Sequence, residues 1–199
     1  MAFDWRPFFT STQRLIDHAE GVFGLYHDSL QGMWRFHDMV EGIVAGEVES
    51  GLSREQALGF TLAHGDGDPQ PQNLLHFSTL GETLERTRHG GTNELVLGQM
   101  CLVSIYAFWE VRTRNELAEV LGISLDGVRS DLFGDIRLLR HMLLHRAGKA
   151  DGSANRLKIL KWCSPGELIV VDRPRLREVI NRIRDFPDGL HTPGFDPHR

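Results

Sequence analysis

The first quarter of the chain shows a helical pattern of apolar positions. From Ser11 to about Glu49, the residues that share one helix face recur every three or four positions. This face contains Leu15, Ala19, Val22, Tyr26, Leu30, Met33, His37 and Val40. Glycine weakens a helix, and five glycines interrupt the segment, at positions 21, 24, 32, 42 and 46. The pattern therefore predicts either one long helix or two helices with a break.

A short helix and a loop are predicted next. Ser53 is a candidate N-cap for a helix over residues 53–62. Residues 64–73 are rich in glycine, aspartate and proline, which predicts a loop, and a helix is predicted from His76 to Arg88. Four residues in and beside the loop could suggest a metal site: His64, Asp66, Asp68 and His76. Their spacing matches no established site, so a turn is the favoured interpretation and no metal is expected.

Two strongly patterned helices are predicted in the middle of the chain. The first covers residues 94–121 and is closed by Gly122. The second covers residues 124–147, with Ser124 as its N-cap and Gly148 as its stop. Because only a short gap separates them, we expect an antiparallel hairpin.

The last quarter is predicted to contain two shorter helices, over residues 154–162 and 175–186, with an extended segment at 167–171. Residues 187–199 are rich in proline and glycine, so a flexible tail is expected.

Together these elements predict an all-α fold. Its centre is a helical bundle built around the long antiparallel helix hairpin (94–121 and 124–147), with an N-terminal helical extension. We divide the chain into the extension (1–63), the loop (64–73), the bundle (74–186) and the tail (187–199).

Composition favours a globular protein of the cytoplasm. Cys101 and Cys163 lie far apart in no metal-type spacing, which predicts free, reduced thiols. The first fifteen residues contain charged side chains and no apolar core, so no secretory signal is expected. The apolar stretch at 95–109 has about fifteen residues, fewer than a membrane span needs. It predicts a buried core helix and no membrane association.

Charge is distributed unevenly along the chain. The net charge is −5, yet residues 137–184 contain 12 of the 22 lysines and arginines and only 4 of the 27 acidic residues. Such a basic segment is typical of a phosphate-binding face, although solvated charges on the later helices would give the same count.

Near the start of the basic segment is the sequence Arg-His-Met-Leu-Leu-His, at residues 140–145. An arginine such as Arg140 can hold a phosphate through two parallel hydrogen bonds. A histidine such as His145 titrates near neutral pH and can move the protons of phosphodiester cleavage. On a helical wheel, Arg137, Arg140, His141 and His145 share an arc of about 140° beside the apolar stripe. The side chains needed for metal-free RNA cleavage are therefore predicted to lie together.

The run from Ser130 to His145 resembles the motif helix of the HEPN superfamily. The signature of that helix is an arginine followed directly by a polar residue, with a histidine further along. Four to six positions separate the arginine from the histidine. Arg140, His141 and His145 match it, and the stretch 102–110 is similar to the helix that pairs with it. The resemblance covers about residues 92–186.

The resemblance implies a metal-independent endoribonuclease without a cofactor. The ribose 2′-hydroxyl would attack the adjacent phosphate, with His145 as general base or acid, Arg140 stabilising the phosphorane and His141 positioning the phosphate. It also implies a homodimer in which two motifs face one cleft, and a toxin or anti-phage role with an antitoxin or other regulatory partner. Toxins paired with a nucleotidyltransferase usually have a tyrosine two residues after the histidine. Ala147 stands there, which argues against modification at that position.

Several further residues are assigned supporting roles. Glu110 could hold Arg140 across the hairpin, although an exposed glutamate is an equal alternative, and Arg137 adds charge beside the motif. Candidate RNA-binding residues are Arg146, Lys149, Arg156, Lys158 and Lys161. Tyr106 and Trp109 are expected to be core aromatics rather than base-stacking platforms.

Three interpretations of function stay open. The first is an RNase. The second is a non-catalytic HEPN-like module that binds RNA or a protein. The third is a helical bundle that binds a small molecule or a nucleotide. Against any function of the motif stands a purely structural interpretation, in which Arg140 and His145 only complement the negative end of the helix dipole.

Overall fold

The computed structural model describes residues 4–65 and 74–186. The predicted tail and most of the predicted loop lie outside these ranges. The chain forms two compact units: Met1–Tyr26 together with Val96–Arg199, called unit 1 here, and His27–Leu95, called unit 2. These units divide the chain differently from the ranges predicted above, because the first part of the N-terminal helix belongs with the second half of the chain.

The N-terminal segment forms one continuous helix, α1 (Arg6–Glu49), of 44 residues. This settles the alternative left open by its five glycines. A Cβ atom added at any of these glycines would meet nothing within 4 Å, so they lie where no packing is required. The helix packs through buried apolar residues on one face. These include Leu15, Ala19 and Tyr26 in unit 1, and Val40 and Val44 in unit 2.

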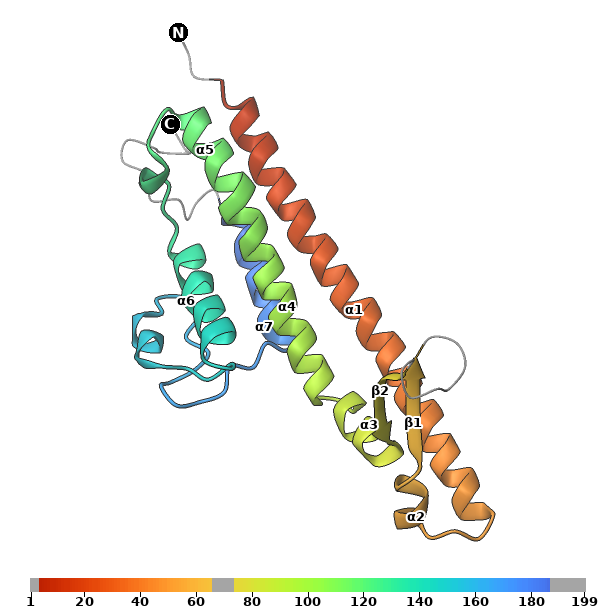
Figure 1. The fold of residues 1–199 in the computed structure, drawn as a ribbon. Coiled ribbons are helices and arrows are strands. Elements are labelled where there is room, and N and C mark those ends of the chain that lie inside the picture. Colours follow the sequence, from red (N-terminus) through yellow and green to blue (C-terminus); the bar gives the residue numbers. More distant parts are fainter. Residues whose placement is uncertain (1–3, 66–73, 187–199) are drawn as a thin grey trace. The chain divides into compact units, whose positions relative to one another are not determined.

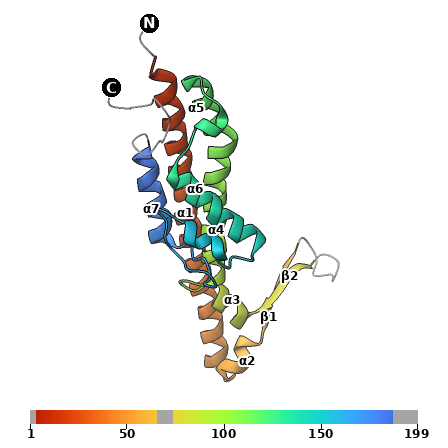
Figure 2. The same cartoon turned by 90° about the vertical axis from the view of Figure 1, so that its left-hand side faces the viewer.

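Unit 2 contains a strand pair that the all-α prediction missed. After α2 (Arg54–Leu58), capped by Ser53 as predicted, strand β1 (Thr61–Gly65) pairs antiparallel with β2 (Leu74–Thr79). Figure 2 shows the two strands side by side, running away from α2 and α3. The predicted helix at 76–88 therefore begins later, as α3 (Leu80–Thr87).

Residues 76–79 form a strand instead of a helix because they pair with β1, and the local sequence pattern does not reveal this pairing. The backbone of β2 finds its hydrogen-bond partners in β1, on the far side of the predicted loop. Thr79 ends the strand and caps α3 in a capping box with Glu82. The core of the unit consists of Val40, Val44, Ala57, Leu80 and Leu84.

In unit 1 the first predicted central helix is confirmed. It runs through α4 (Thr92–Phe108), the π-helical segment η2 (Trp109–Thr113) and α5 (Arg114–Leu121). Gly122 ends it in the left-handed conformation, with φ 65°.

This helix is longer than its apolar stretch at 95–109. From Thr92 to Leu121 it has 30 residues, and by length and composition alone it could cross a membrane. A single helix of this kind is weak evidence for a span, because the core helix of a soluble protein meets the same criteria. Its length therefore gives no ground for excluding a membrane span.

The second central helix starts later than predicted. A short 3₁₀ turn, η3 (Leu125–Gly127), and an extended stretch containing the buried Val128 come first. Helix α6 covers Asp131–His145, and its N-cap is Ser130 rather than Ser124. Val128 is buried in this extended connection, and its burial helps to stabilise the connection. The tight hairpin of two long helices is thus not confirmed, although the predicted C-terminal end of α6 is correct to within two residues.

The predicted helix at 154–162 is also wrong. The structure has a 3₁₀ segment, η4 (Gly152–Arg156), followed by backbone without regular helix up to α7 (Arg173–Arg184). Within that stretch Leu168 forms a β-bridge with Lys149, which agrees with the extended segment predicted at 167–171. Helix α7 is confirmed, and it starts two residues early because Asp172 caps it.

The core of unit 1 brings α4, η2, α6 and α7 together (Figure 1). Trp109 stacks on Phe133 with centroids 4.1 Å apart, and the ring of Phe186 meets both edge-on. Gly98 permits a close backbone approach, because a Cβ there would lie 1.8 Å from the Val171 carbonyl oxygen. Trp109 is therefore a core aromatic, as predicted.

Candidate functional site

Helix α6 turns its apolar stripe into the core and so exposes the motif. Seven of its residues are buried, among them Ile136, Leu139 and Met142. His141 and His145 are exposed, as is Arg137 one turn earlier, and Arg140 is half-buried. This arrangement agrees with the predicted arc of polar side chains beside a buried stripe.

Arg140 packs on a buried aromatic ring. Its guanidinium carbon lies 5.4 Å from the centroid of Tyr106, which is 5% exposed. A cation over the face of an aromatic ring is attracted by the ring quadrupole. Tyr106 thus restricts the Arg140 side chain, and no described residue accepts a hydrogen bond from its five N–H donors, which can therefore bind an anion.

Glu110 is not placed to hold Arg140. Its carboxylate accepts a hydrogen bond from the Tyr106 hydroxyl at 3.0 Å and another from Arg114 at 3.1 Å. Arg114 lies one turn further along the same helix, so the Glu110 carboxylate forms its ion pair with Arg114. Among the described residues Glu110 forms no ion pair or hydrogen bond with Arg140, so the predicted direct contact is not found.

The two histidines of the motif lie next to each other. The ring centroids of His141 and His145 are 4.8 Å apart, with an interplanar angle of 44°. His145 is the last residue of α6, so it also lies at the negative end of the helix dipole. Two imidazoles one turn apart can both reach a single phosphate group.

The motif is free of neutralising carboxylates. Within residues 4–65 and 74–186, neither Arg137, Arg140, His141 nor His145 has a carboxylate within ion-pair distance. Because no internal anion competes there, the site can accept an external one.

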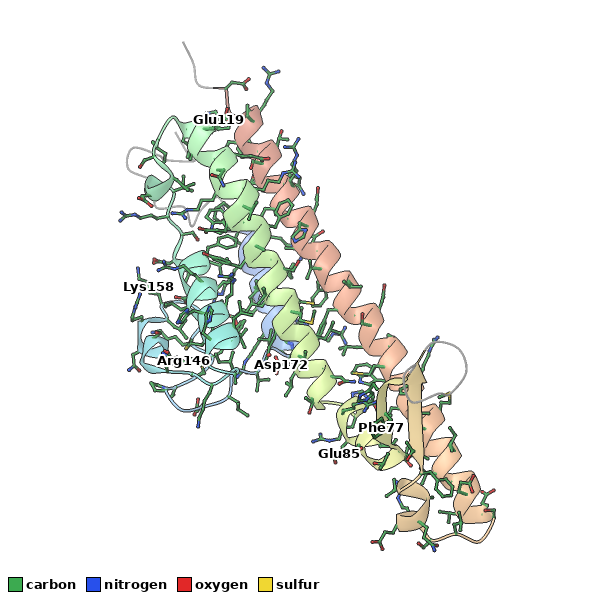
Figure 3. The ribbon with its side chains drawn as sticks, viewed as in Figure 1. Phe77, Glu85, Glu119, Arg146, Lys158 and Asp172 are labelled. Atoms are coloured by element: carbon green, nitrogen blue, oxygen red, sulfur yellow. The ribbon has the colours of Figure 1, made fainter. Side chains whose placement is uncertain are left out.

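The candidate RNA-binding residues fall into two groups. Arg146 pairs with Asp151 at 3.3 Å, and Lys158 pairs with Asp131 at 2.6 Å. Figure 3 shows Arg146 and Lys158 on the side of α6 that faces away from α4. The others, Lys149, Arg156 and Lys161, are exposed and have no ion-pair partner among the described residues. Only this second group offers charge that no ion pair already satisfies.

Asp135 is a buried carboxylate that the sequence did not single out. It is 2% exposed, and its two oxygens accept hydrogen bonds from the backbone N–H groups of Lys158, Ile159 and Leu160 at 2.6–3.0 Å. The segment after η4 is therefore anchored to the middle of α6. This anchoring also explains why no helix forms there, since the N–H groups bond to a side chain.

A cavity of about 400 Å³ lies beside the N-terminal half of α6. Its lining includes Tyr106, Trp109 and Glu110 from the long helix, and Gly134 and Arg137 from α6. Sequence patterns gave no sign of it, because its walls come from two separate segments, residues 106–114 and 126–137.

Two kinds of side chain have raised pKa values. Burial raises the pKa of Tyr106 to about 12, helped by the neighbouring Glu110 carboxylate, so the phenol stays protonated and donates. Burial raises the pKa of Cys101 to about 11 and also raises that of Cys163. Both cysteines are free thiols, as predicted.

The four residues that could suggest a metal site in and beside the loop are only partly described. His76 contacts Arg86, with 3.1 Å between Nε2 and a guanidinium nitrogen. Asp66, Asp68 and the side chain of His64 lie outside the described residues. In the ranges that the structure covers, no three histidine, cysteine or acidic residues cluster as metal ligands would.

Comparison of the chain with protein-family models, with curated proteins and with solved structures found no match.

Proposed function

We propose that the protein is a metal-independent endoribonuclease of the HEPN type. One observation carries the proposal: Arg140, which lies over the Tyr106 ring, directly precedes the exposed His141 and is five residues before the exposed His145, and these side chains have no carboxylate in ion-pair range among the described residues. This combination supplies a fixed anion holder next to groups that can transfer protons at neutral pH.

The reaction uses the ribose 2′-hydroxyl as its nucleophile. The 2′-oxygen forms a bond to phosphorus while the bond from phosphorus to the 5′-oxygen breaks, leaving a 2′,3′-cyclic phosphate and a 5′-hydroxyl. His145 takes the proton from the nucleophile or gives one to the leaving oxygen. Arg140 stabilises the negative charge that builds on the nonbridging oxygens, and His141 positions the phosphate.

In-line cleavage needs a base on one side of the phosphorus and an acid on the other. His141 and His145 share one face of α6, so one chain presents its imidazoles from a single side. We therefore propose a homodimer in which each motif supplies one of the two groups. In a cell such an RNase would act as a toxin or anti-phage effector in the cytoplasm, neutralised by a protein partner.

The same observation favours one alternative function. A chain whose histidines lie on a single side could bind RNA or a protein without cleaving anything, as a non-catalytic HEPN-like module. The exposed cations Lys149, Arg156 and Lys161 would serve that role equally well.

Cleavage of mixed RNA in the presence of EDTA separates the two functions. We expect the wild-type protein to produce 2′,3′-cyclic phosphate ends and His145→Ala to lower the rate by about 100-fold or more. The matched control is His27→Ala, which removes a half-exposed histidine from α1. Circular dichroism and light scattering should first show the same fold and oligomeric state for all three proteins.

Two results would overturn the RNase. One is the absence of cleavage of every RNA offered, tRNA included, by a folded wild-type protein. The other is equal cleavage by wild type and His145→Ala. RNA binding without cleavage would support the alternative module.

A further inference from the structure

A second cavity, of about 450 Å³, lies beside the N-terminal half of α6. Its lining residues come from α6 and from positions 156–158, and three of them are cationic: Arg137, Arg156 and Lys158. We call it the basic cavity. The described residues that line it include no aromatic ring, so a base would find no surface there on which to stack.

The two carboxylates of the basic cavity already have donors of their own. Asp131 forms an ion pair with Lys158, with 2.6 Å between the carboxylate oxygen and Nζ. Asp135 is 2% exposed and accepts the backbone N–H groups of residues 158–160. The charges of Lys158 and of both carboxylates are therefore satisfied within the protein.

Arg137 and Arg156 carry the charge that remains. Both are exposed, and neither has an ion-pair partner among the described residues. Arg137 also lines the cavity that contains Glu110, but that carboxylate is paired with Arg114. The basic cavity thus offers two guanidinium groups without an anion, and a planar guanidinium can bind a phosphate through two parallel hydrogen bonds.

The fold holds both arginines on ordered backbone. Arg137 follows the buried Ile136 in α6. Arg156 is the last residue of η4 and precedes the buried Leu157. The hydrogen bonds from residues 158–160 to Asp135 fasten this segment to α6. A ligand that contacts both arginines would not have to order the backbone first, which lowers the entropic cost of binding.

The basic cavity continues the polar face of the motif. Arg137, His141 and His145 follow one another at four-residue intervals, so each lies about 6 Å further along the axis of α6 than the one before. Every nucleotide of an RNA strand carries a phosphate. A strand whose scissile phosphate lies at Arg140 and His145 can therefore follow α6 and bring another phosphate to Arg137.

We propose that the basic cavity binds a backbone phosphate of single-stranded RNA through Arg137 and Arg156, close along the strand to the scissile phosphate. Such a contact positions the strand on α6 and is independent of base sequence. Because its ligand is the RNA substrate, the inference rests on the proposed function. Binding does not require cleavage, so the two can be tested separately.

The test measures the binding of an oligouridine of about ten nucleotides to His145→Ala protein at several salt concentrations. We expect the added changes Arg137→Gln and Arg156→Gln together to weaken binding about tenfold. The slope of log K against log salt should become shallower by about 0.7, the value for one phosphate of a single strand.

The matched control is Arg177→Gln in the same His145→Ala protein. It removes an exposed arginine of α7 that also has no ion-pair partner in the described part of the chain. Because Arg177 does not line the basic cavity, both the affinity and the salt slope should stay close to those of the parent. Circular dichroism should first show the same fold for all of the variants.

Two further probes identify the ligand group as a phosphate. Oligoadenosine of the same length should show the same loss of affinity in the double arginine variant, because the site contacts no base. Oligouridine with neutral methylphosphonate linkages should bind weakly, and the two arginine changes should weaken it no further. A loss confined to oligouridine would overturn the backbone contact, as would an equal loss with the neutral strand.

Three other results would overturn the phosphate site: an unchanged affinity and slope in the double arginine variant, equal losses in Arg177→Gln, or no binding of RNA by His145→Ala protein. None of them depends on whether wild-type protein cleaves RNA. The expected losses, together with a wild-type protein that cleaves nothing, would retain the site and reject the RNase. Cleavage by wild type, together with an unchanged double variant, would reject the site and retain the RNase.

Discussion

The two ends of α6 differ in how their charges are satisfied. At the N-terminal end, Asp131 is paired with Lys158 and Asp135 is buried under three backbone N–H groups. At the C-terminal end, Arg140 and His145 have no carboxylate within ion-pair distance in the described part of the chain. One end of the helix thus fixes the surrounding chain, and the other leaves its charge available for a ligand.

This difference shows that neighbouring polar residues on one helix can have separate roles. Asp135 and Arg140 are five positions apart, yet the first is 2% exposed and the second is half-buried over a ring. A polar group that is fully bonded inside the protein contributes to stability. A charged group with unused donors at the surface contributes to binding.

The largest effect is expected from Asp135→Ala. This change leaves the N–H groups of Lys158, Ile159 and Leu160 without their acceptor, and each lost partner costs about 1–3 kcal/mol. We expect the free energy of unfolding in urea to fall by about 3 kcal/mol or more. The control is Asp126→Ala, because that carboxylate is 95% exposed and its removal should change little. Similar losses in both variants would contradict the anchoring role of Asp135.

A smaller effect is expected from Tyr106, whose ring lies beneath Arg140. Tyr106→Leu removes the ring beneath Arg140, and RNA cleavage should fall by about tenfold. Tyr106→Phe keeps the ring and loses only the hydrogen bond to Glu110, so its cleavage should stay within a few-fold of wild type. The two changes should also be made in Arg140→Lys. If Tyr106 acts through Arg140, Tyr106→Leu will lower the cleavage rate less in the Arg140→Lys background than in wild type. An equal loss of rate in both backgrounds would show that the two residues act independently.

The smallest effect is expected at the turn that closes α6. Ala147 adopts φ 50° and Gly148 adopts φ 75°, and both values are costly for residues that have a Cβ atom. Ala147→Gly should therefore stabilise the protein by about 1 kcal/mol. Gly148→Ala should destabilise it by a similar amount. Thermal unfolding measures both changes in stability. If both variants are stabilised, or both destabilised, the left-handed backbone assigned to Ala147 and Gly148 would be contradicted.

Local pattern was enough to predict much of the helical structure. The apolar periodicity identified α1, the long helix up to Gly122, the body of α6 and α7, because burying one face of a helix needs a regular spacing of apolar side chains. The same periodicity placed His141 and His145 on the exposed side of α6. The boundary errors occurred where caps compete, as between Ser124 and Ser130, since several residues near a helix start have suitable side chains.

The errors have a common physical cause. The β1–β2 pair joins backbone across residues 66–73, and the turn at 158–160 bonds to Asp135 more than twenty positions away. In both places a hydrogen bond to a distant residue replaced the helical bond that the local sequence favours. The cavity of about 400 Å³ beside α6 has the same origin, because its walls come from residues 106–114 and 126–137.

The sequence by itself determined the long helices and which side chains of the motif helix face outward, because these follow from a spacing of three to four residues. Only the tertiary structure decided which charges find partners. Arg140 lies over Tyr106 instead of pairing with Glu110, Lys158 pairs with Asp131, and Asp135 is fully bonded. Electrostatic and hydrogen-bond partners are selected by proximity in space, and that proximity exists only after the chain has packed.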